Sequence, residues 1–397
     1  MAMASAERLR VLNVITHLDA GGATDAALNA CAYISAERFA PTLVCGPSPE
    51  EEGDVKFRAD GLGVEVVTIP TLGRSIDPIR DVRALRALRR LFRATRPDIV
   101  HTHSSKAGFL GRLAARRERT PAVIHTVHGW SFHDYMPRRD RMLFTAVERR
   151  GAKWTDRIVT VSELDRSKGL AAGIGSFELY SVIHELNDLE PFLGVDDAPA
   201  ASRARLGLPA DALVIGTVGR LSDQKDPMTF VRSAAAIAAE IPEARFVMVG
   251  HGPLRGQVER LVGDLGLRDR FLLTGVRADV PAILRSFDVF LLTSLWEGMP
   301  LVIPQAMACR VPVVASTADG NRELIRDGHN GLLAPPSSPD QFAHGVVRLL
   351  REKDLRDRVV DQGTQTASDF TLAHTIPQLE SLYLDCVHRG NTQVTRR

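Results

Sequence analysis

Two basic residues stand in a short loop that follows an apolar, β-branched run. Arg220 and Lys225 lie in the loop at 219–225, after the run at 213–218 and before a helix-like segment. In a parallel sheet such a loop lies at the carboxyl edge, beside the amino terminus of the next helix. Two cations and the partial positive charge of a helix end form a receptor for a diphosphate. Taken alone, the pair is explained equally well as two exposed side chains.

A second group of residues follows the apolar run at 289–292. Glu297 precedes a turn that contains glycine and proline, and Gln305 stands eight residues later, within the expected helix at 304–309. Glycine and proline at a helix entry let backbone N–H groups approach a ligand closely. A carboxylate at 297 can accept hydrogen bonds from sugar hydroxyls. The two loops together predict a site for a sugar diphosphate.

The first half of the chain carries a similar pattern. Gly21 and Gly22 stand between the apolar run at 11–16 and a helix expected at 24–34. Glycines let the backbone crowd a ligand, and the helix amino terminus favours negative charge. A plain strand-to-helix turn is the alternative interpretation. His128 follows the run at 122–127, which again predicts the carboxyl edge of a sheet.

Further histidines near His128 raise the hypothesis of a metal site. They are His101, His103, His125 and His133. His101 and His103 alternate along a strand end, and no set of cysteines or carboxylates completes a coordination shell. We therefore expect hydrogen-bonded histidines of the core or the site, and no metal and no cofactor.

Short β-branched runs alternate with amphipathic segments along the whole chain, which predicts parallel sheets covered on both faces. Two such series are separated by an Ala-, Asp- and Pro-rich linker at 191–209. The sequence therefore predicts the α/β class with two domains at 1–192 and 193–371, and a last helical segment from 372. The expected strands are 11–16, 42–45, 64–69, 99–101, 122–127, 158–161 and 180–183, then 213–218, 245–249, 271–273, 289–292 and 311–314.

Composition fits a well-folded protein. The chain has 397 residues, of which 44% are hydrophobic and 25% charged, and its net charge is +2. This charge indicates no particular partner, and we expect no nucleic acid. The four cysteines show no paired spacing, so we expect a reducing cytoplasm. The amino terminus lacks the apolar segment of a signal peptide, and no apolar run approaches ~18 residues.

Basic charge is concentrated in one stretch. Residues 74–150 contain 18 Lys and Arg but 7 Asp and Glu. Two interpretations of the helix expected at 78–96 stay open, a solvated face or a peripheral contact with an anionic membrane on the inner face, worth about 1 kcal/mol for each basic side chain. The arginines concerned are Arg80, Arg83, Arg86, Arg89, Arg90, Arg93 and Arg96.

The loops at 219–225 and 297–305 together resemble the paired signature of family 4 retaining glycosyltransferases of the GT-B fold. That signature has an Arg and a Lys on the diphosphate and two glutamates separated by seven residues. The likeness extends over nearly the whole chain, and its motifs are specific in this order. The other matching segments are 21–23, 101–108, 126–129, 319–325 and 328–333. The segment at 101–108 is most similar to bacterial enzymes that build surface polysaccharides on lipid carriers.

This resemblance implies two Rossmann-like doubly wound domains that face each other across a cleft, with residues 372–397 packing back on the first. It implies transfer of a hexose or N-acetylhexosamine from a nucleotide-diphosphate sugar, with UDP expected, to a glycan, lipid-linked or small-molecule hydroxyl. Transfer would retain the anomeric configuration and need no metal. The residues implied in catalysis are Arg220, Lys225, Glu297 and His128, and those implied in donor binding are Gly21, Gly22, Gly219, Gly250, His251, Val276, Gly298, Met299, Pro300, Leu301 and Gln305.

The chain departs from the family pattern at three places. Gln305 replaces the second glutamate, which is thought to hold the ribose hydroxyls, and the loss of a charge-assisted bond costs roughly 1 kcal/mol. His251 stands in a glycine-proline loop where a small polar residue is usual. Residues 184–188 replace an Asn/Ser-Gly-Ile-Asp turn.

Three other functions compete with transfer. A nicotinamide-dependent oxidoreductase fits poorly, because the nearest Gly-x-Gly-x-x-Gly match, at 250–256, has its last glycine one position late. A non-hydrolysing nucleotide-sugar epimerase of the same fold stays open. So does a sugar-nucleotide-binding protein of weakened activity, which Gln305 and the altered turn at 184–188 would suggest.

Overall fold

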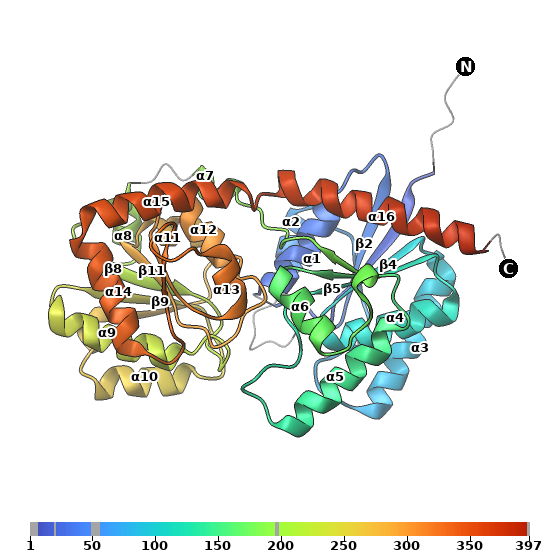
Figure 1. Ribbon diagram of the computed structural model, residues 1–397, viewed down its shortest axis with the longest axis horizontal. Coiled ribbons are helices and arrows are strands. Elements are labelled where there is room, and N and C mark those ends of the chain that lie inside the picture. The colour runs from blue at the N-terminus through green and yellow to red at the C-terminus, as the bar shows by residue number, and fades with distance from the viewer. Residues whose placement is uncertain (1–6, 20, 49–55, 195–197, 395–397) are drawn as a thin grey trace, which may run out of the picture. The chain divides into compact units, whose positions relative to one another are not determined.

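The chain forms two compact units, each built on one parallel sheet. The computed structural model describes residues 7–19, 21–48, 56–194 and 198–394. One unit comprises Met1–Asn187 with Leu372–Arg397, and the other comprises Asp188–Thr371. Helices cover both faces of each sheet (Figure 1). The predicted α/β class with two Rossmann-like domains is confirmed.

The sheet of the first unit has seven parallel strands in the order β3-β2-β1-β4-β5-β6-β7. The order reverses beside β1, as in doubly wound folds. Because both faces are covered, side chains on both sides of the central strands are buried. The buried residues include polar ones such as Asn13, His101 and His125. The strands are β1 (Leu9–Val14), β2 (Phe39–Cys45), β3 (Val66–Thr68), β4 (Ile99–His103), β5 (Ala122–Val127), β6 (Arg157–Thr160) and β7 (Tyr180–Val182).

Two sets of helices cover this sheet. Side chains of alternate residues enter different cores, because successive residues of a strand point to opposite faces. Val11 lies in the core on the side of α1 and α16, whereas Leu12 lies in the core on the side of α3 and α4. The helices of this unit are α1 (Gly22–Ala32), α2 (Lys56–Gly61), α3 (Pro78–Thr95), α4 (Ser105–Glu118), α5 (Arg138–Ala152), α6 (Glu163–Ala171) and α16 (Leu372–Val394).

Helix α16 comes from the far end of the chain, yet it completes the core of the first unit (Figure 1). Tyr383 is fully buried, and its ring meets Phe39 edge-on at 5.7 Å between centroids. The Tyr383 hydroxyl lies 2.7 Å from Nδ1 of His101 on β4. Glu380 accepts hydrogen bonds from Ser35 N, at 2.6 Å, and from Arg38.

A buried ion pair joins α4 to α5. Arg112 donates to a carboxylate oxygen of Glu148 at 2.8 Å, and the two side chains are 0% and 4% exposed. Arg112 also donates to the carbonyl oxygen of Gly108. A Cβ atom at Gly151 would lie 2.6 Å from the guanidinium carbon, so glycine at this position makes room for the pair.

The sheet of the second unit has six parallel strands in the order β10-β9-β8-β11-β12-β13. β12 begins two residues later than expected, after Pro312, which has no N–H to donate. β13 was not predicted, because three residues within a glycine-containing run are too short to show a period. The strands are β8 (Val214–Val218), β9 (Arg245–Val249), β10 (Phe271–Gly275), β11 (Val289–Leu292), β12 (Val313–Ser316) and β13 (Leu332–Ala334).

The segment read as a linker contains two short helices that pack within the second unit. Arg203 donates to Asp288 at 2.8 Å and to the carbonyl oxygen of Ser286. These contacts lie within the second unit, which begins at Asp188. The helices are α7 (Glu190–Leu193), α8 (Pro199–Arg205), α9 (Pro227–Glu240), α10 (Arg255–Asp264), α11 (Val280–Arg285), α12 (Val302–Ala308), α13 (Asp319–Leu324), α14 (Pro339–Arg351) and α15 (Lys353–Ser368).

The four cysteines Cys31, Cys45, Cys309 and Cys386 are all buried as free thiols, as expected for Cys45. Burial raises the pKa of Cys31 and Cys309 to about 12. Within the described part of the chain, no helix combines the length and the apolar character needed to cross a membrane.

Tyr383 provides a test of how much α16 contributes to the first unit. We expect Tyr383→Ala to lower the free energy of unfolding by about 3–5 kcal/mol, because a large buried ring is lost. Tyr383→Phe removes only the hydroxyl beside His101 and costs about 1–2 kcal/mol. Calorimetric unfolding measures both, with Tyr135→Phe on the exposed surface as control. An unchanged unfolding midpoint in Tyr383→Ala would contradict this role of α16.

Candidate active site

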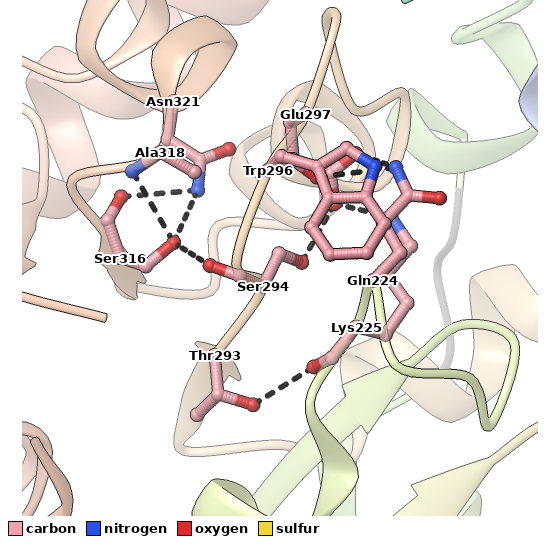
Figure 2. A network of polar contacts seen from close by, with 9 residues as sticks. All are labelled: Gln224, Lys225, Thr293, Ser294, Trp296, Glu297, Ser316, Ala318 and Asn321. Atoms are coloured by element: carbon pink, nitrogen blue, oxygen red, sulfur yellow. Dashed lines mark hydrogen bonds and ion pairs between the residues drawn. The ribbon is translucent and has the colours of Figure 1, made fainter. Parts of the chain in front are cut away.

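Glu297 is the centre of a polar network at the carboxyl edge of the second sheet (Figure 2). Its side chain is 5% exposed and lies in the loop after β11. Lys225 Nζ lies 2.5 Å from Oε1, and Ser294 Oγ donates to the same oxygen at 2.6 Å. Gln224 Nε2 donates to Oε2 at 3.3 Å and to the carbonyl oxygen of Trp296 at 3.1 Å. Both carboxylate oxygens therefore have partners, as a buried charge requires.

Hydrogen bonds also fix the two loops that carry this network. The Thr293 hydroxyl donates to the carbonyl oxygens of Lys225 and Asp226, at 3.1 and 2.9 Å. Ser316 Oγ donates to the carbonyl oxygen of Ser294 at 2.6 Å, and Asn321 Nδ2 contacts Ser316 in turn (Figure 2). The loops after β8, β11 and β12 are thus joined into one assembly.

Arg220 and Gly219 directly follow β8, where the sequence places them, and Arg220 is half-buried. The helix amino terminus beside them is not open to an anion. Asp226 caps α9, because its carboxylate accepts from Thr229 N at 3.2 Å and from Thr229 Oγ1 at 2.6 Å. The Asp226 carboxylate therefore occupies the helix end where the sequence predicts a diphosphate. The cations remain as the positive groups of the loop.

Glycines let these loops approach one another. Gly250 has φ +135°, and a Cβ atom there would lie 2.0 Å from the carbonyl oxygen of Gly219. A Cβ atom at Gly320 would lie 1.8 Å from the carbonyl oxygen of Gly298. The requirement for glycine at 250 and 320 therefore comes from backbone packing within the unit, whatever a ligand adds.

The remaining predicted donor residues fall into two groups. Gly298, Met299, Pro300 and Leu301 are buried and lead into α12, which begins at Val302. Gln305 is half-buried within that helix. His251 follows β9 and is exposed, and Val276 follows β10 and is 51% exposed. All of these residues lie in segments after the carboxyl ends of strands, or in the helix that follows.

The arrangement suits an anionic ligand that carries hydroxyl groups. Lys225 and Glu297 form an ion pair in this structure, and Arg220 lies in the same loop as Lys225. A ligand phosphate at Lys225 would compete with Glu297, and a ligand hydroxyl could then donate to the released carboxylate oxygen. Such a ligand would therefore have to break the contact between Lys225 and Glu297.

In the first unit, Gly21 is the residue that precedes α1, and Gly22 is its first residue. Gly21 provides no side-chain cap. Instead, the Thr24 hydroxyl donates to a carboxylate oxygen of Asp19 at 3.0 Å. The loop before α1 thus carries a carboxylate close to the helix end where the sequence predicted an anion contact.

His128 directly follows β5, and both of its ring nitrogens contact protein groups. Nδ1 lies 2.8 and 3.0 Å from the two carboxylate oxygens of Glu185. Nε2 lies 2.9 Å from Nδ1 of His103, whose Nε2 lies 3.1 Å from Oδ1 of Asn13. A hydrogen bond from His128 to a sugar hydroxyl, the expected role, would therefore replace one of these contacts.

The other strand histidines are buried and hydrogen-bonded, as expected. Nε2 of His101 lies 2.7 Å from the Thr126 hydroxyl, and Nδ1 of His125 lies 2.9 Å from the Thr102 hydroxyl. Burial lowers the pKa of His101 to about 3 and holds the pKa of His125 well below its usual value. Among the residues that the structure describes, no three His, Cys, Asp or Glu side chains are grouped to hold a metal ion.

Sequence reasoning missed four polar residues that complete these networks. Ser294 and Gln224 are the neighbours of Glu297, and Glu185 and Asn13 belong to the chain that includes His128. Gln224 lies next to Lys225, and Ser294 lies three residues before Glu297, so proximity in sequence was an available signal. No such signal links Glu185 to His128.

Comparison with protein families gives two matches that together span most of the chain. Residues 21–176 match the family described as "Glycosyl transferase 4-like domain". Residues 212–352 match the family described as "Glycosyl transferases group 1". The first match falls in the first unit, and the second falls in the second unit.

Curated relatives and solved structures agree with these matches. A UDP-Gal:alpha-D-GlcNAc-diphosphoundecaprenol alpha-1,3-galactosyltransferase from Escherichia coli is 34% identical over 360 residues, which are 88% of this chain and 90% of that protein. The putative glycosyltransferase EpsD of Bacillus subtilis is 27% identical, over 80% of this chain and 84% of its own. The structure of Alr3699/HepE from Anabaena with UDP and glucose has a TM-score of 0.82 at 20% identity, covering 95% of this chain and all of that one, and shows a shared fold.

The buried histidines predict how stability depends on pH. The unfolded chain takes up protons on His101 near pH 6.5, whereas the folded chain does so only near its pKa of about 3. The contribution of neutral, buried His101 to the free energy of unfolding is therefore fully present above about pH 6.5 and is lost as the pH falls toward 3. We expect His101 to account for a loss of about 2 kcal/mol between pH 7 and pH 5.

Urea denaturation of the wild type and of His101→Asn at both pH values measures this contribution. The variant is expected to lose about 2 kcal/mol less than the wild type over the same interval. This difference removes the effect of carboxyl groups such as Asp25 and Asp156, whose pKa burial raises. Equal losses in the two proteins would contradict the prediction.

Proposed function

Because this chain belongs to the family 4 glycosyltransferases of the GT-B fold, we propose that it transfers a hexose or N-acetylhexosamine from a UDP-sugar to an acceptor hydroxyl. The observation that carries the proposal is the network of Lys225, Ser294 and Gln224 around Glu297, with Arg220 in the same loop as Lys225. A cation and a carboxylate in contact can separate to bind the phosphate and the hydroxyls of one ligand.

The relatives support UDP as the nucleotide. The Escherichia coli enzyme takes UDP-Gal, and the Anabaena structure holds UDP with glucose. The first of these also acts on a sugar carried by diphosphoundecaprenol. A lipid-linked sugar is therefore the acceptor that we propose, and galactose is the first donor sugar to test.

Cleavage of the donor places negative charge on the departing diphosphate. Arg220 and Lys225 stabilise this charge more strongly in the transition state than in the bound substrate. Glu297 then accepts hydrogen bonds from hydroxyls of the sugar and orients it. The role that the resemblance implies for His128, a hydrogen bond to a sugar hydroxyl, stays a prediction. Gln305 stands where the family has a second carboxylate, and it can accept one hydrogen bond and donate another.

We further propose that transfer retains the anomeric configuration and needs no metal. A mechanism through two carboxylates, as in retaining glycosidases, has no support at positions 297 and 305, because residue 305 is glutamine. The acceptor is then expected to attack from the face that the diphosphate leaves. The anomeric configuration of the product, read by NMR, and an unchanged rate after chelation test the two statements.

Epimerisation of the donor is the second candidate. It uses the same fold and a nucleotide sugar but no acceptor, so incubation with UDP-galactose alone separates the two functions. Conversion of the sugar without an acceptor supports epimerisation, and consumption only with an acceptor supports transfer. Binding without either reaction supports a sugar-nucleotide-binding protein of weakened activity.

The exposed face of α3 supports a peripheral membrane contact. Ile79 is 67% exposed and Val82 is 46% exposed near the start of this helix. Arg83, Arg86 and Arg90 are exposed beside them. Arg89 and Arg93, in contrast, pair with Glu118 at 2.6 and 3.0 Å. We propose that the exposed arginines attract anionic headgroups while the two apolar side chains enter the interface. This would bring the enzyme to a lipid-linked acceptor on the inner face of the membrane, in the cytoplasm.

Arg220 and Lys225 provide the test of the proposed reaction. We expect Arg220→Ala and Lys225→Ala each to reduce kcat/KM by about 100-fold or more, since each removes charge stabilisation of the leaving group. The assay follows transfer from UDP-galactose to a short-chain GlcNAc-diphospho-lipid by mass spectrometry. Exposed Arg232→Ala on α9 serves as a control for loss of positive charge in the same unit.

Unchanged unfolding midpoints would show that the two site variants remain folded. A rate close to that of the wild type in either variant, with transfer established for the wild type, would refute the assignment of that residue.

Reversal of charge on α3 tests the membrane proposal. We expect glutamate at Arg80, Arg83, Arg86 and Arg90 to abolish sedimentation with vesicles of phosphatidylglycerol and phosphatidylcholine, since each arginine contributes about 1 kcal/mol at an anionic surface. Vesicles of phosphatidylcholine alone are the control for electrostatic attraction. Binding to anionic vesicles that this variant leaves unchanged would overturn the proposal.

A further inference from the structure

The ion pair between Lys225 and Glu297 joins a partly exposed cation to a buried carboxylate. The Lys225 side chain is 22% exposed, whereas that of Glu297 is 5% exposed. The lysine can therefore turn toward a ligand, while the carboxylate is enclosed by the protein. In the pair of Arg112 with Glu148, in contrast, both side chains are buried. The Lys225–Glu297 pair is thus one from which the cation can be withdrawn.

Hydrogen bonds from neutral groups hold the Glu297 carboxylate in place independently of Lys225 (Figure 2). Ser294 Oγ donates to Oε1 at 2.6 Å, and Gln224 Nε2 donates to Oε2 at 3.3 Å. The orientation of the Gln224 amide is determined by the carbonyl oxygen of Trp296, which can only accept and lies 3.1 Å from Nε2. The carboxylate therefore stays at its position when the lysine moves.

The aliphatic part of Lys225 lies against the first residue of its own loop. A Cβ atom at Gly219 would lie 3.6 Å from Cδ and from Cε of Lys225. Arg220 follows Gly219 directly. The ammonium group of Lys225 thus belongs to the loop that is proposed to bind the diphosphate, and it contacts Glu297 of another loop. One cation can therefore pair with two anions in turn, a carboxylate of the protein and a phosphate of a ligand.

Withdrawal of Lys225 changes what Glu297 requires. Lys225 and Ser294 both contact Oε1, so departure of the lysine opens an acceptor site on this oxygen. It also leaves a buried negative charge without its cation, which is unfavourable. A hydroxyl group that donates to Oε1 offsets part of this cost, because a hydrogen bond to an ionised acceptor is roughly twice as strong as one between neutral groups.

A sugar nucleotide and a bare nucleotide meet this requirement differently. Both bring a phosphate group for Lys225, but the hexose brings additional hydroxyl groups that can donate to Oε1 of Glu297. UDP alone leaves the carboxylate with Ser294 and Gln224 as its donors. The ion pair therefore opposes the binding of UDP more strongly than the binding of a UDP-sugar.

We propose that the Lys225–Glu297 ion pair makes the second unit select a UDP-sugar over UDP, and that the pair re-forms once the sugar has been transferred and so promotes the release of UDP. Glu297 then has a role besides orienting the sugar, because it competes for the cation that holds the product. This inference rests on the proposed transferase function, and it uses residues of the second unit alone.

Glu297→Gln separates the two ligands. The variant keeps the length of the side chain but removes its charge, so a phosphate no longer competes with a carboxylate for Lys225. We expect the affinity for UDP to rise about tenfold. The affinity for UDP-galactose should not rise, because the hydrogen bond from the sugar is weakened at the same time. Isothermal titration without an acceptor measures both. An equal rise for the two ligands would show a general effect of charge and would overturn the proposal.

Ser294→Ala is a second test that leaves both charges in place. Loss of this hydroxyl makes Glu297 depend more on Lys225, so we expect the affinity for UDP to fall about threefold to tenfold. A fall in UDP affinity in both site variants would contradict the proposal. Glu240→Gln, which neutralises the exposed pair with Arg351 in the same unit, should leave both affinities unchanged. Unfolding midpoints show whether the variants remain folded.

The outcomes distinguish this inference from the proposed function. If the wild type binds neither UDP nor any UDP-hexose or UDP-N-acetylhexosamine, the proposed function fails and the inference fails with it. If the wild type binds a UDP-sugar but Glu297→Gln binds UDP no more tightly than the wild type, the inference alone fails. A wild type that binds UDP and none of these UDP-sugars would also overturn the inference.

Discussion

Burial of one carboxylate determines how the loops of the second unit are arranged. Glu297 is almost completely withdrawn from solvent, and a charge in that position is stable only with close partners. Those partners come from the loop after β8 and from the loop that carries Glu297 itself. Removal of Lys225 would take away a cationic partner of this carboxylate and keep the hydrogen bonds from Ser294 and Gln224. The contact between Lys225 and Glu297 also joins the two loops. A ligand phosphate that binds Lys225 would replace Glu297 in this contact.

The first unit also contains two buried carboxylates that need close partners. Glu148 is paired with Arg112 in the space between two helices, and this pair has no opening for a ligand, since both side chains are at most 4% exposed. Glu185 is paired with His128 beside the ends of the strands, where part of the ring is exposed. The two contacts differ in the exposure of the partner, because the Arg112 side chain is 0% exposed and that of His128 is 10% exposed.

Much of this arrangement could be predicted from the chain, because parallel strands buried on both faces are continuous apolar runs. The strands at Ala122–Val127, Arg245–Val249 and Val289–Leu292 have the expected bounds. The loops that carry Arg220 and Glu297 were predicted for the same reason. Contacts between residues such as Lys225 and Glu297, 72 positions apart, could not be predicted, since a sequence places two charges at an edge but not atom against atom. The cap on α9 was readable, because Asp226 before Pro227 is a usual helix start.

The return of α16 to the first sheet affects how the protein folds during synthesis. The hydroxyl of Tyr383 meets a histidine that lies 282 positions earlier in the chain. During translation, α16 therefore becomes available to the amino-terminal sheet only after the whole second unit has been synthesised. The middle of the chain holds its own core and can fold while the earlier residues still expose apolar surface on one face. The first unit begins earlier in the chain, but the second unit is the first to have all of its residues synthesised.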